Sequence, residues 1–170
     1  PFLALVTPPS REQKLIPREL TVLVDHSGSM QGAKWDAADW AVKRLIGMLT
    51  ENDCFRIGVF HSTVAWWSDT PKTMDDEARK DAIHFLESHK DSGGTELGVA
   101  LEQALQGHSP SGEFSRQVLI VTDAQVSDEG RLIRLAEEES KHADRRRISI
   151  LCVDSSPNAA LARQLAEAGG

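Results

Sequence analysis

The stretch that decides the fold runs Leu20-Thr21-Val22-Leu23-Val24-Asp25-His26-Ser27-Gly28-Ser29-Met30. Its first five residues are apolar or β-branched, which is typical of a strand buried inside a sheet. One carboxylate and two hydroxyls follow at alternate positions, with a glycine between the serines that lets the backbone bend. Oxygen ligands of this kind suit a hard divalent cation such as Mg²⁺ better than Zn²⁺, which prefers nitrogen and sulfur. The stretch therefore predicts part of a metal site at the end of a buried strand.

Helices and further strands alternate along the rest of the chain. Apolar residues at helical spacing predict helices at 34–49, 73–88, 97–105 and 128–143, and a last helix that Ser156 caps before Pro157. Apolar runs predict strands at 54–60, 63–67, 118–121 and 148–154. Only two residues separate the strands at 54–60 and 63–67, so this pair must be an antiparallel hairpin. The pattern predicts an α/β fold whose central sheet is mostly parallel, with one antiparallel edge strand and helices on both faces.

The first seventeen residues are read differently from the rest. Pro8, Pro9 and Pro17 forbid a helix there, and we interpret residues 1–17 as an entry strand and a linker from a preceding domain. The chain begins without an initiator methionine, so we expect it to be a piece of a longer protein. Residues 18–170 are expected to form one domain, which is large enough to bury its own core.

Composition argues against several classes of partner. The net charge is −7 and the isoelectric point is near 5.3, whereas binding to a nucleic-acid backbone requires a basic face. No apolar run approaches the ~20 residues of a membrane span, and the apolar start of the chain is too short for a signal peptide. We expect no nucleic-acid partner and no membrane insertion in this segment. Cys54 and Cys152 lie in apolar runs and are expected to be small buried thiols.

Three oxygen-bearing loops are expected to meet at one edge of the sheet. They are Asp25-x-Ser27-x-Ser29, Gly93-Gly94-Thr95 and Thr122-Asp123. In sheets of this kind ligands bind beyond the carboxyl ends of the strands, and Asp25 and Asp123 both stand at such ends. Each loop alone has a purely structural explanation, because serine and threonine cap helices and aspartate accepts hydrogen bonds in turns. Their combination favours a shared site.

Together, the loops resemble the metal-ion-dependent adhesion site of the von Willebrand factor A family, over almost all of residues 18–170. The resemblance implies a three-layer Rossmann-like fold and a sixth metal position that an acidic group of a partner fills. Two carboxylates and three neutral hydroxyls leave the ion electrophilic enough to attract that extra carboxylate. We also expect four residues to face the ligand, His26, Met30, Gly94 and Gln125. The metal ligands that the resemblance implies are Asp25, Ser27, Ser29, Thr95 and Asp123.

Particular residues indicate one subgroup of this family. Residues 2–9, the Arg18-Glu19-Leu20 step and the loop at 25–30 are similar to the subgroup that carries an inter-alpha-trypsin inhibitor heavy-chain type domain upstream. Many bacterial surface or envelope proteins share this arrangement, so we expect a cell-surface, envelope or secreted location rather than a cytoplasmic one. Ala124 departs from the family, which usually has glycine there. Gly169-Gly170 ends the chain before a last edge strand, so we expect that strand to be missing.

Three functions are compatible with these features. The first is a non-catalytic module that binds a protein partner through Mg²⁺, with Mn²⁺ or Ca²⁺ as alternatives. The second is a magnesium-dependent phosphoryl-transfer or hydrolase enzyme with Asp25 as nucleophile. Ser27 argues against it, because an aspartyl phosphatase needs a second carboxylate at that position, and neither a phosphate-binding loop nor a nucleophile elbow is present. The third is a metal-free scaffold, which the intact ligand set disfavours. We expect a binding module and no enzyme.

Overall fold

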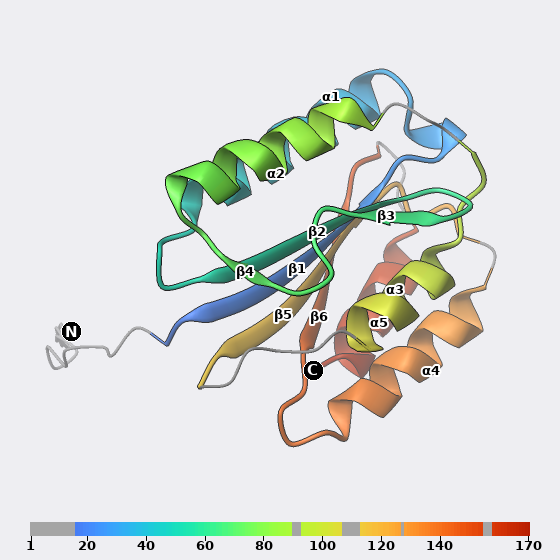
Figure 1. The fold of residues 1–170 in the computed structure, drawn as a ribbon. Coiled ribbons are helices and arrows are strands. Elements are labelled where there is room, and N and C mark those ends of the chain that lie inside the picture. The colour runs from blue at the N-terminus through green and yellow to red at the C-terminus, as the bar shows by residue number, and fades with distance from the viewer. Residues whose placement is uncertain (1–15, 90–92, 107–112, 127, 155–157) are drawn as a thin grey trace, which may run out of the picture.

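A six-stranded sheet forms the middle of the computed structural model, which describes residues 16–89, 93–106, 113–126, 128–154 and 158–170 (Figure 1). The strand order is β3-β2-β1-β5-β6. Strand β4 pairs with the start of β2, on the same edge that pairs with β3 at its other end. The pairs β1–β2, β1–β5 and β5–β6 are parallel, while β3 and β4 both run antiparallel to β2. The strands are β1 (Arg18–Asp25), β2 (Cys54–Phe60), β3 (Val64–Trp66), β4 (Lys72–Thr73), β5 (Ser115–Thr122) and β6 (Arg147–Cys152).

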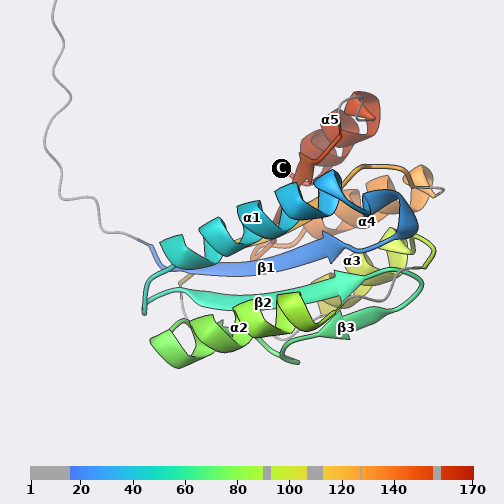
Figure 2. The same ribbon diagram turned by 90° about the horizontal axis from the view of Figure 1, so that it is seen from above.

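Helices cover both faces of this sheet, which confirms the predicted three layers (Figures 1 and 2). One face carries α1 (Ala33–Met48) and α2 (Asp76–Ser88). The other face carries α3 (Leu97–Gln106), α4 (Glu129–Ser140) and α5 (Ala159–Ala168). A short 3-10 helix, η1 (Gly28–Met30), links β1 to α1. The mostly parallel sheet and its antiparallel hairpin are as predicted, and the two-residue strand β4 is an addition.

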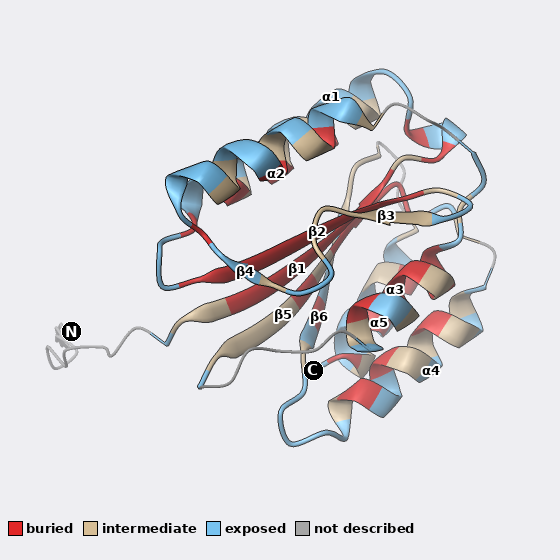
Figure 3. Ribbon diagram, in the orientation of Figure 1, coloured by how far each residue is buried: buried red, intermediate tan, exposed pale blue. Residues whose placement is uncertain are grey.

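The core lies in two layers, one on each side of the sheet, and β2 and nearly all of β1 are buried between them (Figure 3). Strand β1 lies between two parallel neighbours, and seven of its eight residues are buried. This explains its continuous apolar sequence, because residues on both sides of the strand face a helical layer. Val22 and Val24 pack toward α1 and α2, while Leu23 packs toward α3, α4 and α5. Asp25 therefore ends a strand at the centre of the sheet, where its carboxylate is fully buried.

Two helices are capped at residues other than those the sequence suggested. Thr73, where the helix at 73–88 was expected to begin, lies in β4, and the N-cap of α2 is Asp75, whose Oδ1 accepts a hydrogen bond from the Ala78 N–H at 2.7 Å. The last helix is capped by Asn158, whose Oδ1 accepts from the Leu161 N–H at 3.1 Å. Asparagine and aspartate cap as well as serine and threonine, so composition alone does not select among neighbouring candidates. Ser156, Pro157 and most of the predicted entry strand lie outside the described residues.

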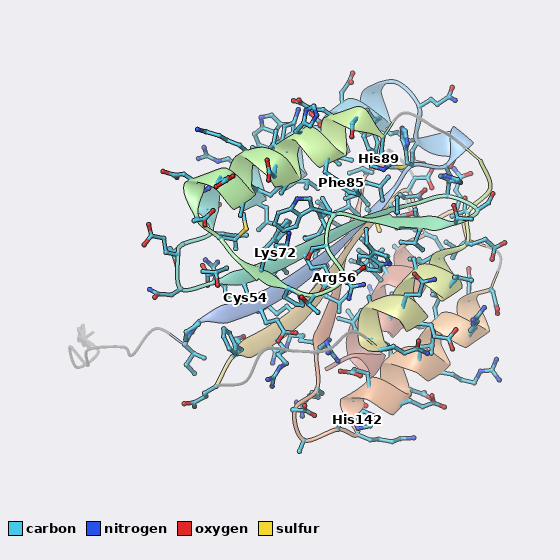
Figure 4. All side chains as sticks on the ribbon, in the orientation of Figure 1. Cys54, Arg56, Lys72, Phe85, His89 and His142 are labelled. Carbon is cyan, nitrogen blue, oxygen red and sulfur yellow. The ribbon has the colours of Figure 1, made fainter. Side chains whose placement is uncertain are left out.

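The adjacent tryptophans of the hairpin point to opposite faces of the sheet, as alternate residues of a strand do. Trp66 faces α3, where the Arg56 guanidinium lies 3.6 Å from its ring centroid, while Trp67 packs on the α2 side near Lys72 (Figure 4). Neither cysteine forms a disulfide; Cys54 is buried as expected, whereas Cys152 is only half-buried. Among the described residues no helix is both long and apolar enough to cross a membrane.

Candidate metal centre

Asp25 is held by neutral donors at the carboxyl end of β1, the right-hand end of the sheet in Figure 2. Its Oδ1 accepts a hydrogen bond from the Ser27 N–H at 2.8 Å, and its Oδ2 accepts from the Thr122 hydroxyl at 2.5 Å. Thr122 is the last residue of β5, which neighbours β1. The parallel pairing thus places the end of one strand against the end of the next. In the described part of the chain, no cationic side chain pairs with Asp25.

The two serines lie side by side in the loop that follows. Their hydroxyl oxygens are 3.1 Å apart, with Ser27 buried and Ser29 exposed. The backbone bends at Gly28, where a 3-10 turn begins, without a positive φ; a positive φ occurs at Gly32 (φ 72°), where the chain enters α1. The loop therefore presents one hydroxyl to the interior, beside the Asp25 carboxylate, and one to the surface.

The Gly93–Thr95 loop lies against this serine loop. The Gly28 N–H donates to the Gly93 carbonyl at 3.2 Å, and the Glu96 N–H donates to the His61 carbonyl at 2.8 Å. Gly94 is fixed by its N–H, which donates to the Ser62 hydroxyl at 3.0 Å. Thr95 is half-buried, two residues before α3 begins. These bonds bring two of the predicted loops together across about 65 residues of sequence, as long-range contacts that local patterns do not specify.

Asp123 follows Thr122 at the end of β5 and is also buried. Its Oδ1 accepts from the Gln125 N–H at 3.1 Å, and its Oδ2 accepts from the Lys34 ammonium at 2.9 Å. The same ammonium donates to Asp154 Oδ2 at 2.8 Å. Lys34 was missed by the sequence reasoning, although a signal was present: it stands in the first turn of α1, where a cation opposes the helix dipole.

Ala124 has a backbone conformation that alanine rarely adopts. Its φ is 61°, and among the described residues it is the only non-glycine with a positive φ. This is the position where glycine was expected from the family resemblance. The turn directs the Ala124 N–H to the Thr122 hydroxyl at 3.1 Å and the next N–H to Asp123. Strain of this kind is concentrated at functional sites in many proteins.

The electrostatics of the two carboxylates differ. Burial raises the pKa of Asp25 above its ordinary value, and hydrogen bonds from Thr122 and Ser27 offset this only in part, while the charge of Asp123 adds to the rise. Asp123 has a cation beside it. The hydrogen bonds of Lys34 to Asp154 and Asp123 raise the pKa of the ammonium, so that it stays charged at neutral pH.

The four residues expected to face a ligand divide into two groups. Gly94 and Gln125 are exposed, and His26 is half-buried with its ring 4.1 Å from the Trp35 ring centroid. Met30 is the exception: it is fully buried in the core beneath α1 and α2, so the expectation that it faces a ligand is wrong. The 3-10 turn at 28–30 causes the difference, because it points the third residue inward while Ser29 points outward.

The donor set fits a hard divalent cation. Asp25, Ser27, Ser29 and Asp123 come from two adjoining strand ends, and all of them offer oxygen. Within the described ranges no three histidine, cysteine, aspartate or glutamate side chains are close enough to share a metal ion, so hydroxyls would have to complete the shell. A buried carboxylate without a cationic partner, such as Asp25, is costly unless a positive charge balances it. The chemistry matches Mg²⁺, Mn²⁺ or Ca²⁺ better than a nitrogen and sulfur site for zinc.

Comparison with known proteins identifies the family. A sequence profile described as the von Willebrand factor type A domain matches residues 18–170. The chain belongs to the von Willebrand factor type A family. A von Willebrand factor A domain-containing protein from Dictyostelium discoideum is 35% identical over 125 residues, which cover 73% of this chain and 14% of that protein. The chain thus spans a small part of the length of that relative.

Two further similarities support the assignment. Inter-alpha-trypsin inhibitor heavy chain H2 of Mus musculus is 30% identical over 90 residues, or 53% of this chain and 10% of that protein. This agrees with the subgroup that the sequence suggested. Manganese-loaded TRAP protein of Plasmodium vivax is similar in fold, with a TM-score of 0.71 and 17% identity over 89% of this chain and 63% of that chain. The von Willebrand factor A fold is therefore established for this domain, and a neighbour of the same fold binds a divalent metal.

Proposed function

We propose that this von Willebrand factor A domain is a non-catalytic protein-binding module of the adhesion type, in which a partner's aspartate or glutamate completes the shell of a bound divalent metal. The observation that carries the proposal is the pair of buried carboxylates, Asp25 and Asp123, at two adjoining strand ends. Ser29, Gly94 and Gln125 are exposed beside them, so a partner can reach the site. The proposed metal ligands are Asp25, Ser27, Ser29, Thr95 and Asp123.

The charge of the site supports an acidic partner. Asp25 and Asp123 together balance the two charges of a divalent cation, and the remaining proposed ligands are neutral hydroxyls. An ion in such a shell still attracts an anionic oxygen, whereas a shell with three or four carboxylates would not. We propose Mg²⁺ as the metal in the cell, with Mn²⁺ and Ca²⁺ as alternatives that fit the same donors. A cell-surface, envelope or secreted location and an upstream domain of the inter-alpha-trypsin inhibitor type are parts of the same proposal.

The first arm of the test measures metal binding through stability. Magnesium at about 100 times its dissociation constant should stabilise the domain by about 2.7 kcal/mol, which is a rise in Tm of about 5–10 °C for a domain of this size. Asp25→Ala and Ser29→Ala should abolish the rise. Ser140→Ala is the matched control, because Ser140 ends α4 shortly before the start of β6, at the opposite end of the sheet, and its hydroxyl donates to the Glu137 carbonyl of its own helix, so it should leave the rise unchanged. An equal rise in all four proteins would contradict the ligand assignment.

The second arm examines the partner. Random peptides displayed on phage and selected on the domain in magnesium should be enriched in one aspartate or glutamate, and EDTA should release them. Enrichment that persists in EDTA, or that shows no preference for acidic residues, would contradict the proposed role of the sixth ligand. The same magnesium-loaded preparation should hydrolyse a generic phosphomonoester only at the buffer rate.

A metal-free scaffold is the second candidate, and Lys34 is the observation that favours it. Its ammonium already supplies a counter-ion for Asp123 without any metal. A scaffold would show the same Tm in EDTA and in all three metals, and its partners would be selected equally in both conditions. The Asp25 carboxylate, which no ammonium or guanidinium of the described chain neutralises, favours the metal-dependent module.

A further inference from the structure

Lys34 occupies a position that helix electrostatics disfavour. It is in the first turn of α1, where the unpaired N–H groups already create positive potential. Its ammonium nevertheless donates to two carboxylates, Asp123 at 2.9 Å and Asp154 at 2.8 Å. These acceptors follow β5 and β6, at 89 and 120 residues from Lys34 in sequence. One side chain thus links the start of α1 to the ends of two neighbouring strands.

The link involves only one of the two proposed metal-binding carboxylates. Asp25 accepts from the Ser27 N–H and the Thr122 hydroxyl, which are neutral donors. Asp123 accepts from the Gln125 N–H and from the Lys34 ammonium. The Asp123 side chain is fully buried and that of Lys34 is 27% exposed, so solvent screens this ion pair less than it would a surface pair.

We propose that Lys34 is a tethered cation that competes with the divalent metal for Asp123, and that Asp154, by sharing the ammonium, sets how strongly it competes. The inference rests on the proposed metal site. A metal bound by Asp123 would face a positive charge held against the same carboxylate, and this repulsion lowers metal affinity. Lys34 also orients Asp123, but the Gln125 N–H holds the other oxygen of that carboxylate without it. The repulsion therefore outweighs the loss of orientation.

Asp154 has the opposite effect. Its Oδ2 accepts from the ammonium at nearly the same distance as Asp123 does, so the two carboxylates share one cation. When a metal occupies the site, Asp154 can retain the ammonium as Asp123 turns toward the metal. Removing the charge of Asp154 leaves Lys34 to Asp123 alone and weakens metal binding. Removal of the Lys34 charge and removal of the Asp154 charge are therefore expected to change the metal affinity in opposite directions.

Titration calorimetry of the whole chain with Mn²⁺ as the probe tests this prediction. Lys34→Met keeps the aliphatic stem and should tighten Mn²⁺ binding about tenfold or more, because a unit charge next to a ligand is removed. Lys34→Arg keeps the charge and should stay within about threefold of the wild type. The matched control is Lys43→Met. Lys43 lies on the same helix and also bridges two carboxylates, those of Asp39 and Glu87, so its loss should leave the affinity unchanged.

A double-mutant cycle isolates the role of Asp154. Asp154→Asn should weaken Mn²⁺ binding about threefold or more in the wild type, and by less than about twofold when Lys34 is already Met. Circular dichroism and Tm in EDTA confirm that each variant is folded. Equal or weaker binding by Lys34→Met overturns the inference while the metal site itself stands. Binding only by Lys34→Met supports it, and absence of binding in both proteins overturns the inference together with the proposed function.

Discussion

Asp53 and Asp25 are buried carboxylates at opposite ends of the same sheet, and their partners differ in charge. Asp53 lies just before β2, where its oxygens accept from the Arg18 N–H and guanidinium at 2.8 to 3.1 Å and from Thr50 at 2.8 and 3.0 Å. Asp25 ends β1 and accepts only from Ser27 and Thr122. One end of the sheet thus contains both charges of an ion pair, and the other contains a carboxylate without its cation.

The pKa shifts of the two residues have opposite directions for this reason. Burial acts to raise the pKa of Asp53, but the hydrogen bonds from Arg18 and Thr50 outweigh it and hold that pKa far below its usual range. Burial also raises the pKa of Asp25, and its neutral donors do not reverse the rise. The comparison shows that burial alone does not mark a functional carboxylate. A buried carboxylate that the chain leaves without a cation is the one expected to bind an external cation.

The largest expected effect is at the end with the complete ion pair. Asp53→Asn should lower the free energy of unfolding by about 2.5 kcal/mol at pH 7, because it removes the charged acceptor of a part-buried ion pair; the value is below that of a fully buried pair because the Arg18 side chain is 37% exposed. The lowered pKa gives the sign of the pH dependence: the stabilisation is present above the unfolded pKa near 4 and is lost as pH falls toward the native pKa. Urea unfolding at pH 7 and pH 3 should therefore show a smaller difference between variant and wild type at pH 3.

The control for this prediction is Asp76→Asn. Asp76 pairs with Arg79 on the surface of α2, and its side chain is 93% exposed, so its loss should move the urea midpoint little. If Asp53→Asn were as mild as the control, the two ends of the sheet would not differ in the way described.

The opposite sign is expected at the other end. In EDTA, Asp25→Asn should raise the free energy of unfolding by about 1–2 kcal/mol at pH 8, because it removes a buried charge and keeps an acceptor for the Ser27 N–H. The raised native pKa means that acidification protonates Asp25 and relieves the same cost in the wild type. The advantage of the variant should therefore shrink as pH falls toward 5. Chemical unfolding at both pH values tests this, and a destabilised variant at pH 8 would show that Asp25 is already balanced.

The sequence predicted the architecture well because its main signals are local. Buried parallel strands read as continuous apolar runs, and the two-residue link at 61–62 required a hairpin. Strand β4 was missed because its two residues, Lys72 and Thr73, carry no periodic pattern. By its charge alone, the run Arg145–Arg147 would be placed on a solvated helix end. In the structure the Arg146 N–H donates to Glu139 at 2.7 Å, and Glu139 is buried.

The candidate site was predictable only in its loops. Asp25, the serines and Asp123 follow strands, and parallel pairing brings strand ends together wherever the strands are neighbours. Lys34 could not be placed, because its contact with Asp123 depends on how α1 crosses the sheet. Met30 was misplaced because hydrophobicity does not say which way a 3-10 turn points a side chain. Whether the five proposed ligands hold a metal remains a prediction.

The smallest expected effect tests whether backbone strain is also confined to the carboxyl end. Ala124 has a φ of 61°, a conformation that costs alanine about 1–2 kcal/mol and glycine almost nothing. Glycine also has more conformational freedom in the unfolded chain, and this lowers the gain in the free energy of unfolding by about 0.5–1 kcal/mol. Ala124→Gly should therefore raise the free energy of unfolding by about 0.5 kcal/mol.

Ala38→Gly is the matched control for this substitution. Ala38 is equally buried but lies within α1, so its replacement should lower stability by about 1 kcal/mol. Precise urea titrations of both variants give the sign. A loss of stability in Ala124→Gly would mean that the turn is unstrained. A gain would place the strain at the turn that directs one N–H to Thr122 and the next to Asp123. The strained turn would then lower the stability of the domain while it orients these two groups, at the end of the sheet where Asp25 lacks a cation.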